Sequence, residues 1–419
     1  MPQSAVNLAA VNPAAAATAT AESPDRRLLS AATGDLPGHL ARFGELPRRG
    51  RPGDLVTELE RAGLTGRGGA AFPAWRKVSA VGQGRRAVVI GNAAEGEPAS
   101  AKDATLLAHA PHLVLDGLQL AADAVGAREV HLSVKSRAAA DAAVRALAER
   151  RAANRDRHQV RVHRTPGGFL SGEASAVVAA VEGRPAVPGF TREHLSSSGV
   201  RGRPTLVQNV ETLAHVALIA RYGADWFRRA GTAEQPGTFL ATISGAVRRP
   251  GVVEAGYGVP LGALLDRAGG PSAPLQAVLI GGYHGAWLPA EAVPEAPVSR
   301  EGLAPWGASP GAGVVIALPT TACGLDLTAR IVNYLAGQSA GQCAPCRNGL
   351  PLIADRLGML AAGTGDPGVV GAVDRLTDLV EGRGVCHHPD GTVRLIRSAL
   401  RTFADDVTAH LAGFCLATR

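Results

Sequence analysis

Three cysteines in the last quarter of the chain, Cys343, Cys346 and Cys386, have side chains and spacing that could bind metal. Cys343 and Cys346 form a C-x-x-C pair, and the chain has five cysteines in all. An odd and sparse set of cysteines in a chain that is not secreted favours metal or redox chemistry over disulfides. Cys323 and Cys415 are expected to be buried, apolar-like side chains and not ligands.

Three loops could hold a phosphate-bearing ligand. The first, at 66–73, has three glycines around Arg67, and such turns let backbone N–H groups approach a phosphate closely. In the second, Asn92, Glu95 and Glu97 follow an apolar strand, where carboxylates could bind the hydroxyls of a ribose. The third carries Glu173 and opens a helix, whose N-terminus attracts anions. Taken alone, the first loop also suits an ordinary tight turn and the second a solvated acidic loop.

Alternating strands and helices would position these loops. The predicted strands span 85–92, 129–135 and 158–164, and the predicted helices span 104–126 (with a break at Pro111), 136–153 and 206–221. This alternation is typical of a parallel α/β sheet, which binds ligands at the carboxyl ends of its strands. We therefore expect the polar loops to meet at one edge of the sheet.

The rest of the chain changes character twice. Short strands between glycine and proline turns come first, and helices follow, predicted at 326–337, 347–361, 368–381 and 393–412. We therefore predict four segments: a disordered, alanine-rich tail at 1–26, an α/β domain at 27–234, a small β-rich domain at 235–317, and a helical bundle with the cysteine motif at 318–419.

Composition narrows the class of protein. With 46% hydrophobic and 19% charged residues, the chain can bury a large core, which excludes a disordered or collagen-like protein. It has no apolar stretch long enough to span a membrane and no signal-peptide pattern, so we expect a cytoplasmic protein. The net charge of +7 without aromatic interleaving argues against nucleic acid and suits an acidic protein partner. Seven arginines between 145 and 164 could dock such a partner or form a solvated surface.

Six motifs in a fixed order resemble one family. They are GLTGRGGAAFPAWRK, NAAEGEPASAKDATLLAHAPHLVLDGL, GGFLSGEASAVVAAVEGRP, GVRGRPTLVQNVETLAHV, SGAVRRPGVVE and QCAPCRNGLP. Together they cover roughly 60–419 and are similar to the NADH-binding flavoprotein subunit of respiratory complex I. Related modules occur in NAD-linked hydrogenases and formate dehydrogenases. The resemblance implies a parallel-sheet FMN-binding domain, a β-grasp domain of the soluble-ligand-binding type and a C-terminal helical bundle.

The resemblance also implies which residues hold the cofactors. FMN would be bound by Gly66, Arg67, Gly68, Gly69, Lys77, Asn92, Glu95, Gly172, Glu173 and Asn209. The nicotinamide nucleotide would contact Phe72 and Glu97. The iron–sulfur cluster would be bound by Cys343, Cys346 and Cys386.

The chain departs from the family pattern around the nucleotide. Ala94 replaces an Asp, Ala174 replaces the second Glu of G-E-E, and Val78 and Ala80 replace aromatic residues. A lost charged hydrogen bond costs about 2 kcal/mol and a lost aromatic stack about 1 kcal/mol, so these changes predict weaker NADH binding. Two further departures are Gln208 for Asn and Phe169 for Tyr.

The cluster motif departs at Ala340, where the family has its first cysteine. Three thiolates could hold a three-iron cluster, or a four-iron cluster with Ser339, His387, His388 or a partner's group at the odd iron. A zinc ion held by the three cysteines and one of the two histidines is an alternative, and so is an empty site.

These observations predict a divergent, NAD(P)H dehydrogenase-type oxidoreductase. It would move electrons between NAD(P)H and an iron–sulfur cluster or a ferredoxin-like partner subunit, with the flavin carrying the chemistry. Such a protein would work in the cytoplasm, in a complex peripheral to the inner face of the membrane. A non-catalytic docking subunit with vestigial sites and a zinc-stabilised scaffold are the alternatives.

Overall fold

The computed structural model describes residues 26–47, 52–84, 86–165, 167–190 and 193–418. The predicted disordered tail at 1–26 therefore lies outside the described residues, except for its last position. The described chain forms two compact units. The first unit runs to Ala241 and includes Gly251–Val259, and the second contains Thr242–Pro250 and everything from Pro260 onward. This division is coarser than the four predicted segments, whose bounds stay predictions.

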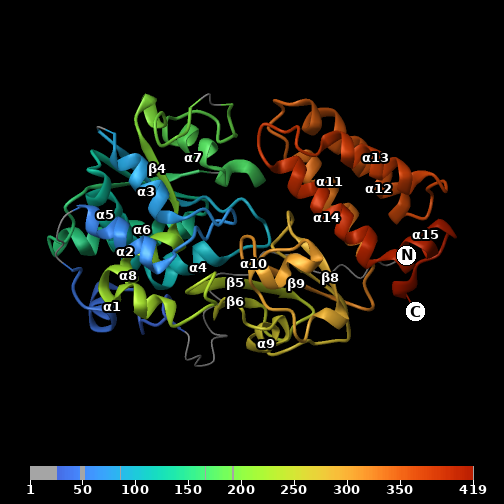
Figure 1. The fold of residues 1–419 in the computed structure, drawn as a ribbon, viewed down its shortest axis with the longest axis horizontal. Helices are drawn as coiled ribbons and strands as arrows, with labels where there is room; N and C mark the ends of the chain where they lie inside the picture. Colours follow the sequence, from blue (N-terminus) through green and yellow to red (C-terminus); the bar gives the residue numbers. More distant parts are fainter. Residues whose placement is uncertain (1–25, 48–51, 85, 166, 191–192, 419) are drawn as a thin grey trace. The chain divides into compact units, whose positions relative to one another are not determined.

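The first unit is built on a four-stranded sheet in the order β3-β2-β1-β4, and Figure 1 labels its edge strand β4. Its strands are β1 (Val88–Ala93), β2 (Glu129–Val134), β3 (Val160–Arg164) and β4 (Thr205–Asn209). Every neighbouring pair is parallel, which confirms the predicted parallel sheet. The predicted helix at 206–221 is wrong in its first residues, because Thr205–Asn209 pair with β1 and the helix begins at Val210.

Eight α-helices belong to the described part of this unit. They are α1 (Leu36–Phe43), α2 (Pro52–Ala62), α3 (Ala74–Gly82), α4 (Lys102–His109), α5 (Pro111–Val125), α6 (Arg137–Ala152), α7 (Ala174–Val181) and α8 (Val210–Arg228). The predicted break at Pro111 is confirmed, since Ala110 separates α4 from α5. Helices α5 and α8 cover one face of β1, where a Cβ at Gly91 would touch Leu118 and Leu213.

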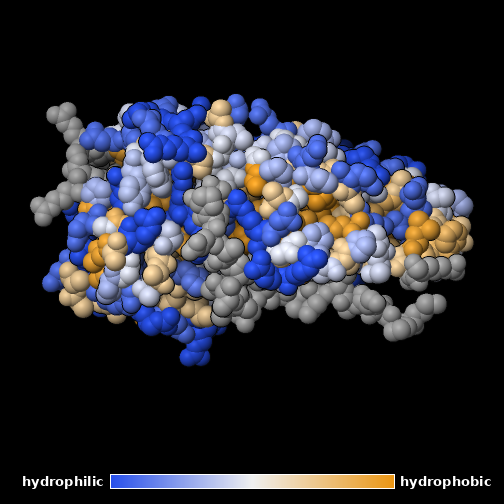
Figure 2. Space-filling model, turned by 90° about the horizontal axis from the view of Figure 1, so that it is seen from below, coloured by the Kyte–Doolittle hydropathy of each residue, from blue (hydrophilic) through white to orange (hydrophobic). Residues whose placement is uncertain are grey.

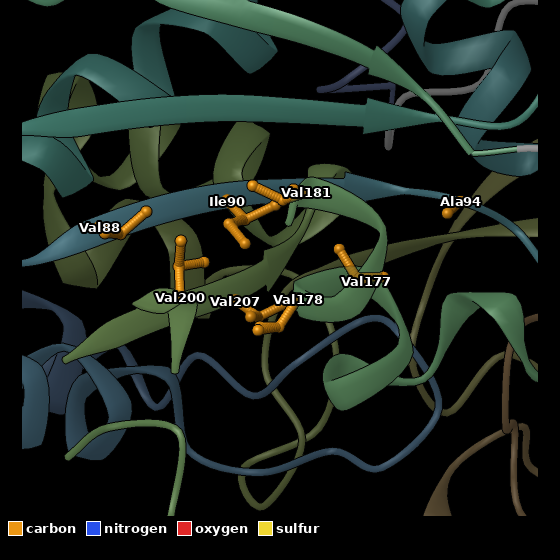
Figure 3. Packing of buried hydrophobic residues seen from close by; sticks show 8 residues of the cluster. All are labelled: Val88, Ile90, Ala94, Val177, Val178, Val181, Val200 and Val207. Atoms are coloured by element: carbon orange, nitrogen blue, oxygen red, sulfur yellow. The ribbon is translucent and has the colours of Figure 1, made fainter. Parts of the chain in front are cut away.

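Helix α7 covers the other face of β1 through a small apolar cluster (Figure 3). Its buried members are Val88, Ile90, Ala94, Val177, Val178, Val181, Val200 and Val207. Because β1, β4 and α7 share this cluster, their polar ends are held at one edge of the sheet. The cluster consists of valine, isoleucine and alanine, in keeping with an aromatic content of only 4%.

A second, mixed sheet has the strand order β6-β5-β9-β7-β8. Its strands are β5 (Thr238–Gly245), β6 (Gly251–Gly256), β7 (Leu275–Ile280), β8 (Ala286–Pro289) and β9 (Val314–Pro319). Strands β5 and β9 are parallel, whereas β7 is antiparallel to both β8 and β9. Two short helices, α9 (Leu261–Arg267) and α10 (Arg300–Leu303), lie in the same stretch of chain. The predicted β-rich stretch is present here.

The C-terminal region is helical, as predicted. It contains α11 (Gly324–Gly337), a short π-helical turn (Pro345–Gly349), α12 (Leu350–Ala361), α13 (Val369–Val380), α14 (His388–Thr402) and α15 (Ala404–Leu411). The single helix predicted at 393–412 is two helices, separated at the buried Phe403. The indole N–H of Trp287 donates to Thr328 on α11 at 3.0 Å, and its backbone N–H donates to Ser398 on α14 at 3.0 Å. These bonds tie the helices to β8.

Hydrophilic and hydrophobic residues are mixed on the face shown in Figure 2. Exposed large hydrophobic side chains in the C-terminal region include Leu352, Leu379, Leu411, Phe414 and Leu416. Within the described ranges, no helix has both the length and the apolar character needed to cross a membrane.

Candidate functional site

Two predicted asparagines are neighbours at the carboxyl edge of the first sheet. Asn92 near the end of β1 is the register partner of Asn209 at the end of β4, and the Asn209 amide donates to the Asn92 carbonyl at 3.3 Å. Asn209 is also the N-cap of α8, because its side chain accepts a hydrogen bond from Glu211 N at 3.0 Å. The two parallel strands therefore place both side chains at the edge where α/β sheets bind ligands.

The glycine loop lies against Asn209. A Cβ at Gly68 would be 3.4 Å from the Asn209 Cβ, and Gly66 N closes the loop by donating to Phe72 O at 2.9 Å. Gly69 has φ +105, a conformation that favours glycine. The loop is thus a turn whose backbone is exposed and which lies at the sheet edge.

Arg67 anchors this loop from inside the protein. Its guanidinium is buried and donates to the carbonyls of Thr65, Pro236 and Thr238 at 3.0–3.2 Å. It also lies 4.7 Å from the ring of Tyr257. Through these contacts the Arg67 side chain holds the loop in place. A direct contact of Arg67 with FMN stays a prediction.

The second and third loops are packed backbone against backbone. The Asn92 amide donates to Gly172 O at 2.9 Å. A Cβ at Gly172 would collide with the Ala94 carbonyl oxygen, and one at Gly96 would collide with the Phe169 carbonyl oxygen. Glu173 accepts hydrogen bonds from Ser175 N and Ala176 N, so it caps α7. Only glycine permits these loops to approach so closely.

A buried ion cluster lies beneath the asparagines. Lys102 contacts Asp103 at 2.6 Å and Glu211 at 3.0 Å, and Asp103 accepts from the Asn209 amide at 2.7 Å. Although burial alone would lower the pKa of Lys102, Asp103 and Glu211 raise it, so the ammonium stays charged. Burial, and then the charge of Asp103, raise the pKa of Glu95 to about 8.

Sequence reasoning assigned no site role to Asp103 or Glu211. The signal was present in the sequence, because Glu211 lies two residues after the predicted ligand Asn209 and Asp103 directly follows Lys102 in the second motif. Asp103 bonds to Asn209 directly, and Glu211 acts on it through Lys102. Both carboxylates are therefore positioning residues for the sheet edge.

Lys77 is a cation without an internal partner. In the described part of the chain its ammonium makes no hydrogen bond or ion pair, and it lies 5.9 Å from the ring of Phe72. Phe72 is 45% exposed. Burial lowers the pKa of Lys77, while the charge of Glu173 raises it. Glu97, the other predicted nucleotide contact, accepts from Ala99 N at 3.2 Å.

The two positions where alanine replaces an acidic residue lie in the same surroundings. Ala94 is a member of the apolar cluster (Figure 3), and Ala174 packs against the same cluster. An aspartate at position 94 would bury a carboxylate among valines, which is costly without a partner. The departures from the family pattern are therefore part of an apolar packing unit between β1 and α7.

These features fit a flavin mononucleotide. The glycine backbone and an unpartnered lysine suit its phosphate, and Asn92 keeps one amide N–H for a polar ring edge, whereas both N–H groups of Asn209 are used inside the protein. The buried amide nitrogen of Gln208 also has no hydrogen-bond partner among the residues described.

Cys343 and Cys346 follow α11 and Cys386 lies near enough to act on Cys346, although the three sulfurs do not all lie within 4.8 Å of one another. Burial, then Cys343 and Cys386 in turn, raise the pKa of the Cys346 thiol to about 12. Ser339 hydrogen-bonds to the same thiol and accepts from Gly341 N at 2.9 Å. Thiols that oppose one another's ionisation suit a shared cation that accepts them all as thiolates.

The two histidines do not complete this site. The His387 side chain is fully exposed and contacts Asp390 at 3.3 Å. His388 is buried, with Nε2 2.9 Å from Leu335 O and Nδ1 3.0 Å from His284 Nε2. Both ring nitrogens of His388 are therefore used elsewhere. Ser339 is the described side chain that accompanies the three cysteines.

Comparison with known proteins defines the class. Residues 59–218 match the family described as the Nuo51 FMN-binding domain, and residues 326–410 match the NADH-ubiquinone oxidoreductase-F iron-sulfur binding region. The first range holds the three loops, and the second holds the three cysteines. The fold and both sites thus define a protein with an FMN-binding domain followed by an iron–sulfur region.

Whole-chain relatives give the family. The F 2 subunit of the NADH-quinone oxidoreductase of Rhizobium meliloti is 31% identical over 381 residues, covering 86% of this chain and 89% of the relative. The F subunit of the Streptomyces coelicolor enzyme is 30% identical over 382 residues, covering 86% and 84%. An NAD+-reducing NiFe-hydrogenase in its H2-reduced state has a similar structure, with TM-score 0.82 and 28% identity, covering 94% of this chain and 68% of that one. The chain belongs to the family of NADH-quinone oxidoreductase F subunits.

Proposed function

We propose that this chain is the electron-input flavoprotein of a multi-subunit redox complex. It would hold FMN at the edge of the first sheet and an iron–sulfur cluster at Cys343, Cys346 and Cys386. FMN supplies the conversion of a two-electron transfer from NADH into single-electron steps. The observation that carries the proposal is the unpartnered Lys77 beside a glycine loop that the sheet holds against Asn209.

The chain's own residues position and tune this site. Lys77 and the backbone of 66–69 would hold the phosphate, Asn92 would offer its remaining amide N–H to the polar edge of the ring, and Asn209 would contact the flavin without a free N–H of its own. Lys102 and Asp103 keep Asn209 in place through bonds of 3.3 and 2.7 Å. Ser339 would provide the fourth group beside the three cysteines of the cluster.

The nucleotide would bind beside Phe72 and Glu97. Because positions 94 and 174 are alanines in an apolar cluster, this side lacks two carboxylates of the family pattern. We propose that NADH binds more weakly here than in relatives that keep both acids, by a factor of about a hundred or more.

An acidic redox protein is the partner that we propose. Arg150 is buried between Asp116 and Asp156, each at 2.8 Å, so it is not part of a docking face. The exposed arginines of this stretch are Arg145, Arg151, Arg157, Arg161 and Arg164. A ferredoxin-like protein docked there would be released by salt, because exposed charges are screened. Such partners would also account for a peripheral place on a membrane complex.

The test is an anaerobic purification, a visible spectrum and titration with NADH and then NADPH. We expect flavin peaks that bleach with NADH. A protein with flavin that does not bleach would overturn NADH as donor, and a colourless protein that takes up no FMN would favour the docking-subunit alternative. Lys77→Gln should lower FMN affinity about tenfold or more, whereas Arg76→Gln, an exposed cation one residue earlier, should leave it unchanged.

A further inference from the structure

Cys323, His410 and Cys415 bring three metal-binding side chains together in the second unit. One ligand atom from each lies within 4.8 Å of the other two, and Cys323 Sγ is 3.4 Å from His410 Nε2. His410 is buried, and both cysteines are partly buried. Sequence reasoning expected these cysteines to be buried apolar-like residues, and it missed His410, which is distant in sequence from Cys323.

Local structure explains how the three side chains meet. Cys323 is the N-cap of α11, where its sulfur accepts from Asp326 N at 3.4 Å. His410 is in the last turn of α15. The chain then reverses at Gly413, which has φ +83 and donates to His410 O at 3.0 Å. This turn returns Cys415 to the side of His410.

This group is separate from the predicted cluster site. Cys323 precedes the first residue of α11, and Cys343 and Cys346 follow its end. A helix of 14 residues is about 20 Å long at about 1.5 Å per residue. Cys323 is therefore too far from the cluster cysteines to share one metal centre with them.

A carboxylate lies one helical turn before His410. Asp406 is at position i−4, so its side chain is on the same face of α15. Its Oδ2 accepts from Gln276 Nε2 at 2.8 Å, while its buried Oδ1 has no hydrogen-bond partner among the residues described. A buried carboxylate oxygen without a partner is costly, and it indicates that a cation or donor is missing.

We propose that Cys323, His410 and Cys415 bind a zinc ion, and that Asp406, which lies outside the group of ligand atoms within 4.8 Å of one another, turns toward the ion as the fourth ligand. Tetrahedral bonds of about 2.3 Å to sulfur and about 2.0 Å to nitrogen separate these two ligand atoms by roughly 3.5 Å. The 3.4 Å between Cys323 Sγ and His410 Nε2 agrees with that separation. Binding releases the two thiol protons, and the ion satisfies the Asp406 oxygen.

The site would be structural. Four protein ligands leave no open position for a substrate, which is the arrangement of closed, structural zinc sites. The ion would fasten the segment after α15 to the start of α11. A disulfide between Cys323 and Cys415 would also join them, but it would use neither His410 nor Asp406.

The test is elemental analysis of the full chain purified without chelators. The Cys343→Ala/Cys346→Ala/Cys386→Ala variant lacks the cluster thiols, and we expect it to keep one zinc per chain. Adding Cys415→Ala or His410→Ala to it should remove the zinc. Asp406→Asn should lower zinc affinity about 10- to 100-fold, whereas Asp405→Asn, its exposed neighbour, should not change it.

Differential alkylation keeps the test decisive if a variant fails to fold. In the wild-type chain we expect Cys323 and Cys415 to become alkylated after a chelator is added and to be protected again by Zn²⁺. A chain without zinc whose two thiols react freely would overturn the proposal. So would a Cys323–Cys415 disulfide in the purified protein, or zinc that survives the loss of Cys415.

Discussion

The sheet-edge loops and the cysteine region solve the problem of holding a cofactor in opposite ways. In the loops, glycines at 66, 68, 69, 96 and 172 shape the site, and the groups presented are largely backbone groups. In the cysteine region the candidate ligands are side chains, Cys343, Cys346 and Cys386. Backbone N–H groups are the same for almost every residue, whereas few side chains can replace a thiolate. The first site can therefore lose several side chains and persist, but the second, which has already lost one cysteine, should not tolerate the loss of another.

The departures from the family pattern illustrate this difference. Ala94 and Ala174 replace acids at the loops, yet the backbone contacts between the loops are intact. Ala340 replaces a cysteine, and three thiols and one serine remain for the cluster. We therefore expect single substitutions to have their largest effects among the cysteines.

The largest expected effect is the loss of iron on replacing Cys346. Cys346→Ala leaves two of the three thiolates, too few to hold a cluster that takes four ligands. Iron content should fall from several atoms per chain to nearly none, while FMN content stays the same. Iron analysis and the flavin spectrum of the same anaerobic sample measure both.

Two matched variants sharpen this result. Cys415→Ala also removes a thiol but should keep its iron. Ala340→Cys restores the fourth cysteine of the family pattern and should slow the loss of iron in air. The comparison between the regions would be wrong if Cys346→Ala kept its iron.

The next largest effect is expected where the backbone itself is changed. Gly172→Ala places a methyl group against the Ala94 carbonyl oxygen, which cannot move without separating the two loops. Overpacking of this kind costs about 1–3 kcal/mol, so FMN affinity should fall about 10- to 100-fold. Fluorescence titration of flavin-stripped protein with FMN measures the change.

Gly189→Ala is the control for this substitution. Gly189 lies in the segment that follows α7, the helix that Gly172 precedes, and a Cβ there would meet nothing within 4 Å. Its FMN affinity should equal that of the wild type. Equal affinity of Gly172→Ala and wild type would show that close backbone packing is not what shapes the site.

Sequence reasoning predicted the parallel sheet and the sheet-edge asparagines, because strand periodicity and family motifs are local signals. It missed β4, since Thr205–Asn209 is short and runs directly into α8. Pairing with β1 and the cap at Asn209 decide that boundary, and the pairing depends on contacts distant in sequence.

The direction of side chains was the other feature that could not be predicted from the sequence. Arg67 is among the residues predicted to bind FMN, and the sequence did not indicate that its guanidinium is directed inward to three carbonyls. His387 and His388 follow Cys386 directly, yet one is fully exposed and the other is bonded to Leu335 and His284. Spacing cannot distinguish these directions, because burial and hydrogen bonding are set by elements elsewhere in the chain.

The smallest effect that we predict is a pH dependence due to Glu95, a side chain within the backbone-built site. Burial and Asp103 raise its pKa from 4.5 to about 8, and the Ser100 hydroxyl donates to it. Between these two values the folded chain holds a proton that the unfolded chain has lost, so rising pH favours unfolding. Below about 4.5 both states are protonated, and above about 8 both are ionised, so the dependence is confined to that window.

Glu95→Gln removes this titration and should flatten the fall in melting temperature of flavin-stripped protein across the window. Glu95→Asp keeps a carboxyl group and should retain the fall. Identical profiles for all three proteins would mean that Glu95 titrates normally. If Glu95→Gln instead lost FMN as completely as Cys346→Ala loses iron, the loops would depend on a single side chain just as the cysteine region does, and the distinction between the two regions would fail.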